Sequence, residues 1–359
     1  MGSFETLNRR GQLIRLGRLA RAALQQYPLE IVRLASMKHE HNTTFRLWTA
    51  DGGRYVMRVH RLGQHTVEAI HSELLWLAAL REDTDLNVPH PVPTENGDLF
   101  AVASVEEVPE PRVCVLFRWM GGRFLDKQLT AGHLEQIGRF TAQLHEHTAH
   151  WPLPADFVRG RVDVLTAEAR RSSRVHPRTT SLADLENHPA DEDVERSLRL
   201  IHELLSPEAA DFVARAVRQI RQALKSLGYT QDTFGLIHAD LHQENYFFHQ
   251  NRVRVIDFDD CGFGHYLFDL NVTLIEVHRF PQYEALRAGL LKGYRSGRTL
   301  DAAHEAYLDS FFALRCLQLL MWVLESREHP TFRDQWEDWA QDELQYVKHF
   351  LGEMNETRI

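Results

Sequence analysis

The sequence predicts an α+β protein in which a small antiparallel sheet comes first and a larger, mainly helical part follows. Before residue 119, short runs rich in β-branched and aromatic residues alternate with polar ones. Beyond it, long segments repeat apolar residues at helical spacing. A chain of 359 residues is long enough for two lobes with buried cores. We therefore predict an N-terminal lobe at 1–119 and a C-terminal lobe at 120–359.

The N-terminal lobe opens with an amphipathic helix over residues 7–27, whose leucines and alanines lie opposite its arginines. Pro28 ends this helix. Three strands follow, in the segments IVRLAS, TTFRLWT and GRYVMRVH, with a hairpin turn at ADGGR between the last two. A helix over residues 64–80 and a further strand, RVCVLFRWM, complete a sheet with one helix packed on it.

The C-terminal lobe begins with a helix over residues 131–147, where apolar side chains recur at helical spacing. Residues 151–230 are polar and mostly helical, and we treat them as an insert with a solvated connection at 170–193. Short strands are expected in FGLIHA, NYFFH and VRVIDF, and the chain is helical from Tyr266 onward. Trp322, in a late apolar helix, is expected in the core.

Composition excludes several classes of protein. The net charge of −9 argues against broad binding to nucleic acid or to an anionic membrane surface. No run of eighteen apolar residues exists, so no membrane span is expected. The three cysteines are odd in number and far apart, which argues against a disulfide framework and a structural zinc site and favours the cytoplasm.

Polar residues gather at the ends of two predicted strands near residue 240. The stretch LIHADLHQENYFF places His238, Asp240 and Asn245 on one connection, and VRVIDFDD ends in Asp257 and two further carboxylates. Asn245 and Asp257 offer oxygen donors that suit a hard cation such as Mg²⁺. Asp240 is separate and is placed to accept a proton from an attacking hydroxyl. This division of roles is what phosphoryl transfer requires.

These two stretches resemble the catalytic loop and the metal-binding strand of the aminoglycoside phosphotransferase/choline kinase family, relatives of the protein kinases. The resemblance implies a two-lobed protein-kinase-like fold that uses ATP and Mg²⁺. It implies Asp240 as the catalytic carboxylate, with Asn245 and Asp257 as metal ligands. It also implies His238 as a structural hydrogen-bonding residue, and Asp269, in GFGHYLFDL, as a buried brace for the loop.

The resemblance extends into the N-terminal lobe. GRYVMRV places Arg58 where kinases carry their phosphate-binding Lys, and SELLWLAAL supplies its partner Glu73. LFRWMGG resembles the hinge, where backbone groups of Arg118–Met120, with Trp119 between them, would meet adenine. Two departures stand out: Arg replaces Lys, and the Gly-rich loop is missing, with Asn42 resembling a shortened phosphate loop.

The acceptor is not fixed by these motifs. A hydroxyl of a small molecule comes first, of the amino alcohol, homoserine, sugar or aminoglycoside type. A Ser/Thr side chain in a protein, as in the stress-response kinases, comes second. A non-catalytic nucleotide-binding regulator and a metal-dependent phosphohydrolase built on DFDD remain open as well. The role of Asp259 is open between a ligand site and a solvated charge, and His242 and Glu244 are expected to be solvated.

Overall fold

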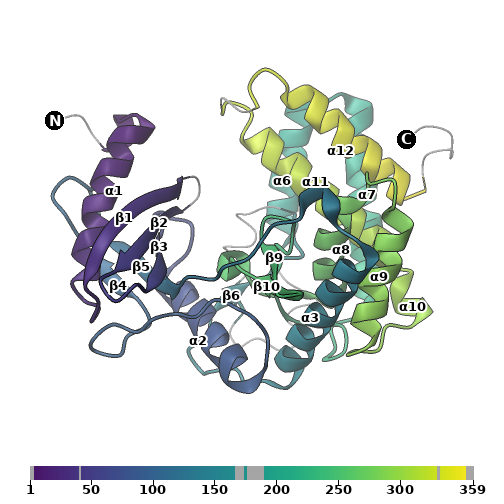
Figure 1. Cartoon of the computed structure of the whole chain (residues 1–359). Coiled ribbons are helices and arrows are strands. Elements are labelled where there is room, and N and C mark those ends of the chain that lie inside the picture. Colours follow the sequence, from purple (N-terminus) through teal and green to yellow (C-terminus); the bar gives the residue numbers. More distant parts are fainter. Residues whose placement is uncertain (1–3, 40–41, 166–173, 176–189, 330–331, 353–359) are drawn as a thin grey trace. The chain divides into compact units, whose positions relative to one another are not determined.

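The computed structural model describes residues 4–39, 42–165, 174–175, 190–329 and 332–352. The chain forms two compact units (Figure 1). The first comprises Met1–Arg123 and Arg254–Asp259, and the second comprises Phe124–Val253 and Asp260–Ile359. The first unit thus extends past the expected boundary at residue 119. It also includes the end of a later strand, which carries Asp257 and Asp259.

An antiparallel sheet of five strands, in the order β1-β2-β3-β5-β4, forms the first unit together with two helices. Its elements are α1 (Arg9–Leu24), β1 (Ile31–His39), β2 (Thr43–Thr49), β3 (Arg54–Val59), α2 (Val67–Asp83), β4 (Ala101–Ala103) and β5 (Arg112–Arg118), preceded by a 3-10 turn at Phe4–Thr6. The antiparallel sheet predicted from the sequence is confirmed. In its register Phe45 lies opposite Met57, and Met57 lies opposite Leu116, so one face of the central strands is apolar.

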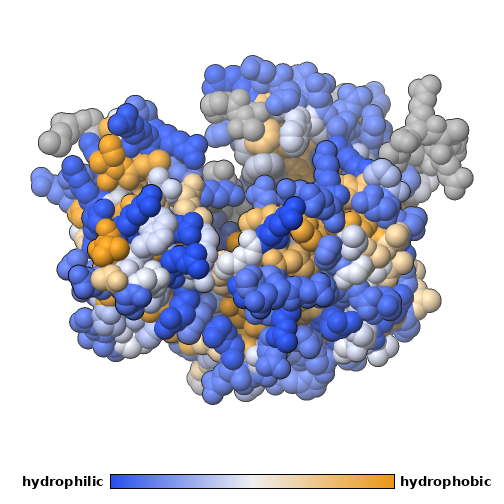
Figure 2. All heavy atoms as spheres, in the orientation of Figure 1, coloured by the Kyte–Doolittle hydropathy of each residue, from blue (hydrophilic) through white to orange (hydrophobic). Residues whose placement is uncertain are grey.

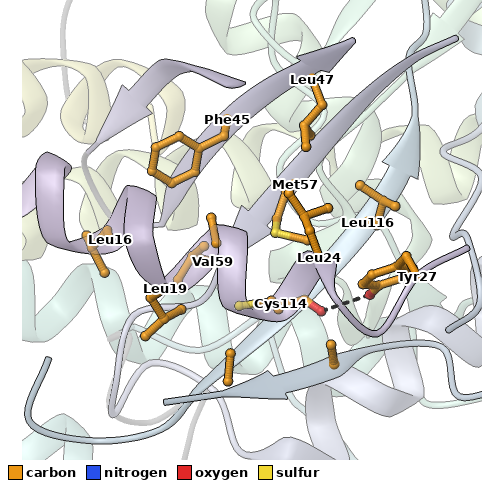
Figure 3. Close-up of a cluster of buried hydrophobic side chains, with 14 of the residues drawn as sticks. Leu16, Leu19, Leu24, Tyr27, Phe45, Leu47, Met57, Val59, Cys114 and Leu116 are labelled. Carbon is orange, nitrogen blue, oxygen red and sulfur yellow. Dashed lines mark hydrogen bonds between the residues drawn. The ribbon is translucent and has the colours of Figure 1, made fainter. Parts of the chain in front are cut away.

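Helix α1 covers this apolar face (Figure 3). Leu16, Leu19 and Leu24 belong to the same buried cluster as Phe45 and the neighbouring strand residues. Burying a side chain of this size contributes roughly 1.5–3 kcal/mol to the free energy of folding, which explains why the leucine stripe of α1 packs against the sheet. The hydroxyl of Tyr27, just past the helix, donates to the carbonyl of Cys114 at 3.4 Å and closes the end of the cluster.

The second unit is mainly helical. Its helices are α3 (Ala131–His150), α6 (Ala190–Leu204), α7 (Pro207–Leu227), α8 (Tyr266–Val277), α9 (Tyr283–Arg295), α10 (Ala302–Glu305), α11 (Leu308–Glu325) and α12 (Trp336–Phe350). Its short strands are β6 (Arg159–Gly160), β7 (Arg174–Val175), β8 (Phe234–Ile237), β9 (Tyr246–His249) and β11 (Gly262–His265), with a 3-10 turn at Asp126–Gln128. The strand β10 (Arg252–Val255) and the 3-10 turn at Phe258–Asp260 each belong partly to the first unit. The strands pair as β6 with β7, β8 with β11 and β9 with β10. The predicted α+β class, with its helical C-terminal part, is confirmed.

The predicted insert at 151–230 contributes to the core of the second unit. Helix α7 buries Phe212, Val213, Ala216 and Ile220 and contacts α11 and α12. Much of the connection expected at 170–193 lies outside the described residues. Where it is described, the 151–230 stretch is therefore an integral part of the unit.

Helix α11 is the apolar centre of this unit. The stretch Ala302–Glu325 is long and apolar enough to cross a membrane by length and composition, but 67% of its most apolar window is buried inside the protein, as in the core helix of a soluble protein. The three cysteines, Cys114, Cys261 and Cys316, are free and buried, as expected of a chain without a disulfide framework.

The exposed apolar side chains include one that we expected in the core. Trp322 on α11 is 43% exposed and meets the buried Phe332 edge to face, with ring centroids 4.8 Å apart. Figure 2 shows a largely hydrophilic surface with apolar patches over α1 and the edge strand β1, where Ile14, Val32 and Met37 are exposed. The core prediction for Trp322 is therefore wrong, because this turn of α11 lies at the surface.

Helices α3 and α9 approach closely through glycines. A Cβ at Gly293 would lie 2.0 Å from the carbonyl oxygen of Glu135, and one at Gly138 would lie 2.0 Å from that of Leu290. Gly289 meets the carbonyl of Ala131 in the same way. Only glycine permits this backbone contact, which fixes α9 against α3.

Replacing Gly293 with Ala should therefore destabilise the protein, because neither helix backbone can move aside without losing its packing. We expect the free energy of unfolding to fall by about 1–3 kcal/mol or more in chemical denaturation. Gly17→Ala in α1 is the matched control. Its nearest neighbour would lie at 3.7 Å, so it should gain up to about 1 kcal/mol of helix propensity. Equal unfolding free energies for Gly293→Ala and the wild type would contradict the close packing.

Candidate active site

In the first unit, a buried ion pair joins the sheet to α2. Arg58 lies on β3, which is hydrogen-bonded on both sides, and its Nη2 donates to Glu73 Oε2 at 2.6 Å. The side chains are 7% and 1% exposed. Burial acts to lower the pKa of Arg58, but Glu73, Asp259 and Asp257 outweigh it and raise that pKa. The predicted pair of Arg58 and Glu73 is present.

Asp259 is the anchor of a polar cluster around Arg58. Its side chain is 7% exposed and lies 3.8 Å from Arg58, 3.6 Å from His60 and 3.5 Å from His65. Burial acts to raise the pKa of Asp259, but Arg58 and the two histidines hold it well below its usual range. Asp259 is thus an internal counter-ion, and the solvated reading of this residue is wrong.

Asn42 is part of the same cluster. Its Nδ2 donates to Asp259 Oδ2 at 2.7 Å, and its Oδ1 accepts from the backbone N–H of Arg61 at 3.1 Å. Both ends of the amide therefore act within the protein and tie β2 to the segment after β3. Direct contact of Asn42 with a phosphate stays a prediction.

Asp257 differs from Asp259 although only Phe258 separates them. Its side chain is 54% exposed, and its Oδ1 lies 3.5 Å from Arg58 Nη1, a long contact. Its φ of 63° places it in the left-handed region, which is uncommon for a residue other than glycine and recurs at functional sites. An exposed carboxylate beside a fixed guanidinium is suited to hold a cation that bridges to phosphate.

The three expected hinge residues differ in whether their backbone N–H groups are already hydrogen-bonded within the protein. The N–H of Arg118 donates to His90 O at 2.9 Å, and that of Trp119 donates to Arg54 O at 2.9 Å. For Met120 no N–H bond is found within the described part of the chain. Of the three predicted hinge residues, Met120 is thus the one whose N–H has no backbone acceptor among the described residues, and its contact with adenine stays a prediction.

In the second unit, the loop after β8 carries His238, Asp240 and Asn245 and is held by Asp269. The Asp269 carboxylate, in the first turn of α8, accepts from the N–H of His238 at 2.9 Å and of Ala239 at 2.6 Å. Ala239 has a φ of 69°, a strained value that lets both N–H groups reach the same carboxylate. The predicted brace is confirmed.

Asp269 is itself held from other helices. His145 of α3 contacts it through Nε2 at 3.1 Å, and the other ring nitrogen of His145 meets the Tyr294 hydroxyl of α9 at 3.0 Å. Both His145 and Asp269 are fully buried. Burial lowers the pKa of His145, which favours the neutral form of this packed hydrogen-bonding residue.

Asp240 lies at the centre of three polar contacts. Its Oδ2 accepts from Asn245 Nδ2 at 3.0 Å and lies 3.2 Å from His242 Nε2, while its Oδ1 lies 3.2 Å from Arg315 Nη2. Burial acts to raise the pKa of Asp240, but the bond from His242 and the charge of Arg315 outweigh it and hold that pKa well below its usual range. Asp240 is therefore an ionised, oriented acceptor.

Each of the two predicted metal ligands carries an oxygen donor of the kind that suits Mg²⁺. Asn245 turns its Nδ2 toward the backbone and side-chain oxygens of Asp240, at 2.9 and 3.0 Å, which directs its Oδ1 away from them. An amide oxygen and the exposed Asp257 carboxylate are hard donors of the kind that hold Mg²⁺ together with substrate phosphates. In the described ranges, no group of three His, Cys, Asp or Glu side chains could hold a metal by itself. Asn245 and Asp257 belong to different units, so their joint ligation stays a prediction.

Sequence reasoning missed two contacts of Asp240. His242, expected to be solvated, is 24% exposed and contacts Asp240. Arg315 was not singled out, although a lone cation inside the apolar run FFALRCLQLLM is a usable signal. A buried charge in such a helix requires a partner, but the sequence does not show which one.

The comparison with known protein families gives a match over most of the chain. The family model described as the phosphotransferase enzyme family matches residues 37–307. The chain belongs to this family. It is a kinase-type phosphotransferase.

The individual relatives described below are also kinases. The amicoumacin kinase of Bacillus subtilis (strain 168) is 22% identical to this phosphotransferase over 279 residues, which cover 74% of this chain and 72% of the relative. A microcompartment-associated aminopropanol kinase of known structure is 29% identical, with a TM-score of 0.74 over 95% of this chain and 98% of the other. The amicoumacin kinase hAmiN, in complex with AMP-PNP, Ca²⁺ and Ami, is 17% identical, with a TM-score of 0.71 over 95% and 94%. The two-lobed kinase-like fold predicted from the sequence is confirmed.

The Asp269 brace leads to a stability prediction. Asp269→Ala leaves two buried N–H groups and His145 without their acceptor, and each such loss costs about 1–3 kcal/mol. We expect the free energy of unfolding to fall by about 3–5 kcal/mol in chemical denaturation. Asp301→Ala, which removes the exposed N-cap of α10, is the control and should cost about 1 kcal/mol. A loss for Asp269→Ala no larger than that of the control would count against the brace.

Proposed function

We propose that this phosphotransferase transfers the γ-phosphoryl group of ATP, with Mg²⁺, to a hydroxyl group of a small molecule. The observation that carries the proposal is the setting of Asp240. Its carboxylate is ionised, partly exposed, and held by Asn245, His242 and Arg315 on a loop that a buried brace keeps in one conformation. A carboxylate prepared in this way orients an attacking hydroxyl, which is the main task of the protein in phosphoryl transfer.

The reaction balances with Asp240 as the proton acceptor. The acceptor oxygen forms a bond to the γ-phosphorus while the bond from that phosphorus to the β–γ bridging oxygen breaks, so ADP leaves with the electron pair. The hydroxyl proton passes to Asp240 and from there to solvent. Because the transition state for this transfer is loose, a weakly basic carboxylate suffices, and orientation matters more than basicity.

Residues of the first unit are proposed to hold the nucleotide. Arg58, steadied by Glu73, would contact phosphate, and the N–H of Met120 would meet the base. Asp257 and Asn245 would ligate Mg²⁺, which when bound neutralises charge on the phosphates. The relative solved with AMP-PNP and Ca²⁺ supports this use of nucleotide and divalent cation.

The acceptor class is supported by the relatives. The solved structure with 29% identity is an aminopropanol kinase, and the curated relative is an amicoumacin kinase. Both names describe kinases of small molecules. We therefore place amino alcohols first among the acceptors to test, ahead of homoserine, sugars and aminoglycosides, and we expect the enzyme to work in the cytoplasm.

Asp240→Asn tests the central role. It should bind MgATP like the wild type but lose turnover by about 10²–10⁴-fold, because the amide cannot accept the proton. The measurement is ADP release with a pool of aminopropanol, ethanolamine, choline, homoserine, sugars and aminoglycosides. Glu244→Gln, on the same loop, is the control and should keep its turnover. Wild-type turnover in Asp240→Asn would overturn the mechanism. Wild-type enzyme that binds MgATP but shows no rise in ADP release with the pool would point instead to a protein acceptor.

Asp257→Ala tests the metal role separately. We expect it to lose the Mg²⁺-dependent part of ATP binding, because an exposed carboxylate is replaced by a methyl group that cannot ligate a cation. Calorimetric titration with ATP, in the presence of Mg²⁺ and of a chelator, measures that part directly. Asp98→Ala removes another exposed carboxylate of the same unit and should leave binding unchanged. If Asp257→Ala bound MgATP as tightly as the wild type, this residue would not be a metal ligand.

A further inference from the structure

Arg315 is a charged residue in a helix that is otherwise apolar. It is the one charged residue between Ser310 and Leu324. Its chain neighbours on α11, Leu314 and Cys316, are buried, and its own side chain is 14% exposed. A guanidinium so placed is costly unless it is paired, so its position points to a specific task.

The pairing of Arg315 is directed at Asp240. Arg315 Nη2 donates to Asp240 Oδ1 at 3.2 Å. The contacts of Asn245 and His242 are with the other carboxylate oxygen, Oδ2. Both carboxylate oxygens of Asp240 are therefore held, and Arg315 sets the rotation of the carboxylate about the last side-chain bond. A planar guanidinium suits this task better than an ammonium, because its donors have fixed directions.

A second residue orients Arg315 in turn. Gln318 lies one helical turn further along α11 and is buried. Its Nε2 donates to the backbone carbonyls of Val162, at 2.9 Å, and Val164, at 2.6 Å. With the amide nitrogen so engaged, its Oε1 faces Arg315 Nη1 at 3.4 Å. A continuous row of hydrogen bonds thus runs from the segment after β6, through Gln318 and Arg315, to Asp240.

We infer that Arg315 is a positioning residue for phosphoryl transfer: oriented by Gln318, it directs the Asp240 carboxylate toward the acceptor hydroxyl. This assignment rests on the proposed function of Asp240. The role of Arg315 differs from that of the brace residue Asp269. Asp269 fixes the backbone of the loop, whereas Arg315 orients the side chain of Asp240. This assignment also explains why a core helix retains a cation.

The test separates positioning from folding by measuring kcat and KM. Arg315→Met and Arg315→Lys are assayed for ADP release with the acceptor pool named above. Misplacement of a catalytic group by about 1 Å costs on the order of 10²-fold, so we expect kcat to fall about 10–100-fold in Arg315→Met and less in Arg315→Lys. The KM for ATP should stay within about twofold, because the side-chain hydrogen bonds of Arg315 in the described part of the chain go to Asp240 and Gln318.

Further variants keep the test decisive if Arg315→Met is unstable. Gln318→Met preserves volume and leaves Arg315 in place without its guide, so kcat should fall several-fold at unchanged nucleotide affinity. Arg287→Met breaks a partly exposed ion pair with Glu305, 2.7 Å in length, and is the control that should keep its turnover. Guanidinium ion added to Arg315→Ala should restore part of the lost kcat, which a purely structural defect would not show.

The outcomes distinguish the two proposals. Wild-type kcat in Arg315→Lys, Arg315→Met and Gln318→Met, with Asp240→Asn inactive, would overturn the role of Arg315 and leave the proposed function intact. Wild-type turnover in Asp240→Asn would overturn both. A lowered kcat in the Arg315 and Gln318 variants, with an unchanged KM for ATP and rescue by guanidinium, would establish the role.

Discussion

The buried carboxylate of Asp269 determines the shape of the loop on which the predicted catalytic residues lie. It binds the N–H groups of two consecutive residues, which is possible because Ala239 adopts the left-handed region. Such a conformation costs about 1–3 kcal/mol, and the charge-assisted bonds to Asp269 offset it. The N-terminal turn of α8 favours the negative charge, and His145 from α3 completes its shell. The close glycine-mediated contact of α3 with α9 therefore bears on the catalytic loop, since Tyr294 of α9 holds His145.

The two carboxylates to which we assign roles in the reaction, Asp240 and Asp257, have opposite surroundings. Asp240 is enclosed by Arg315, His242 and Asn245, so its charge and its direction are both fixed before a substrate arrives. Asp257 is more than half exposed, with a long contact to Arg58, so its oxygens are accessible to a ligand from solution. A group that must orient a hydroxyl benefits from rigidity, whereas a metal ligand must remain open until the cation arrives. Their surroundings, and not the residue type, separate the two proposed roles.

Local patterns predicted most of this arrangement, and tertiary contacts supplied the rest. The spacing of His238, Asp240 and Asn245 predicted the loop, and alternation predicted the strands, because both are properties of consecutive residues. The contact of Arg315 with Asp240 joins residues 75 positions apart, and no spacing rule relates them. Backbone bonding shows why Met120 differs from Arg118, which the hinge motif alone could not reveal. Trp322 was misassigned because helical periodicity indicates which residues share a face but not whether that face is covered.

The DFDD stretch shows how packing gives two nearby carboxylates, Asp257 and Asp259, different surroundings. Phe258 is fully buried and meets Trp76 of α2 edge to face, with ring centroids 5.4 Å apart. This contact fixes the turn so that Asp257 faces solvent while Asp259 faces Arg58 and the two histidines. Because α2 also carries Glu73, the partner of Arg58, a shift of this helix would displace both ends of the cluster together. Asp257 and Arg58, the proposed metal ligand and the proposed phosphate-binding residue, are thus positioned by one helix, through one aromatic contact and one buried ion pair.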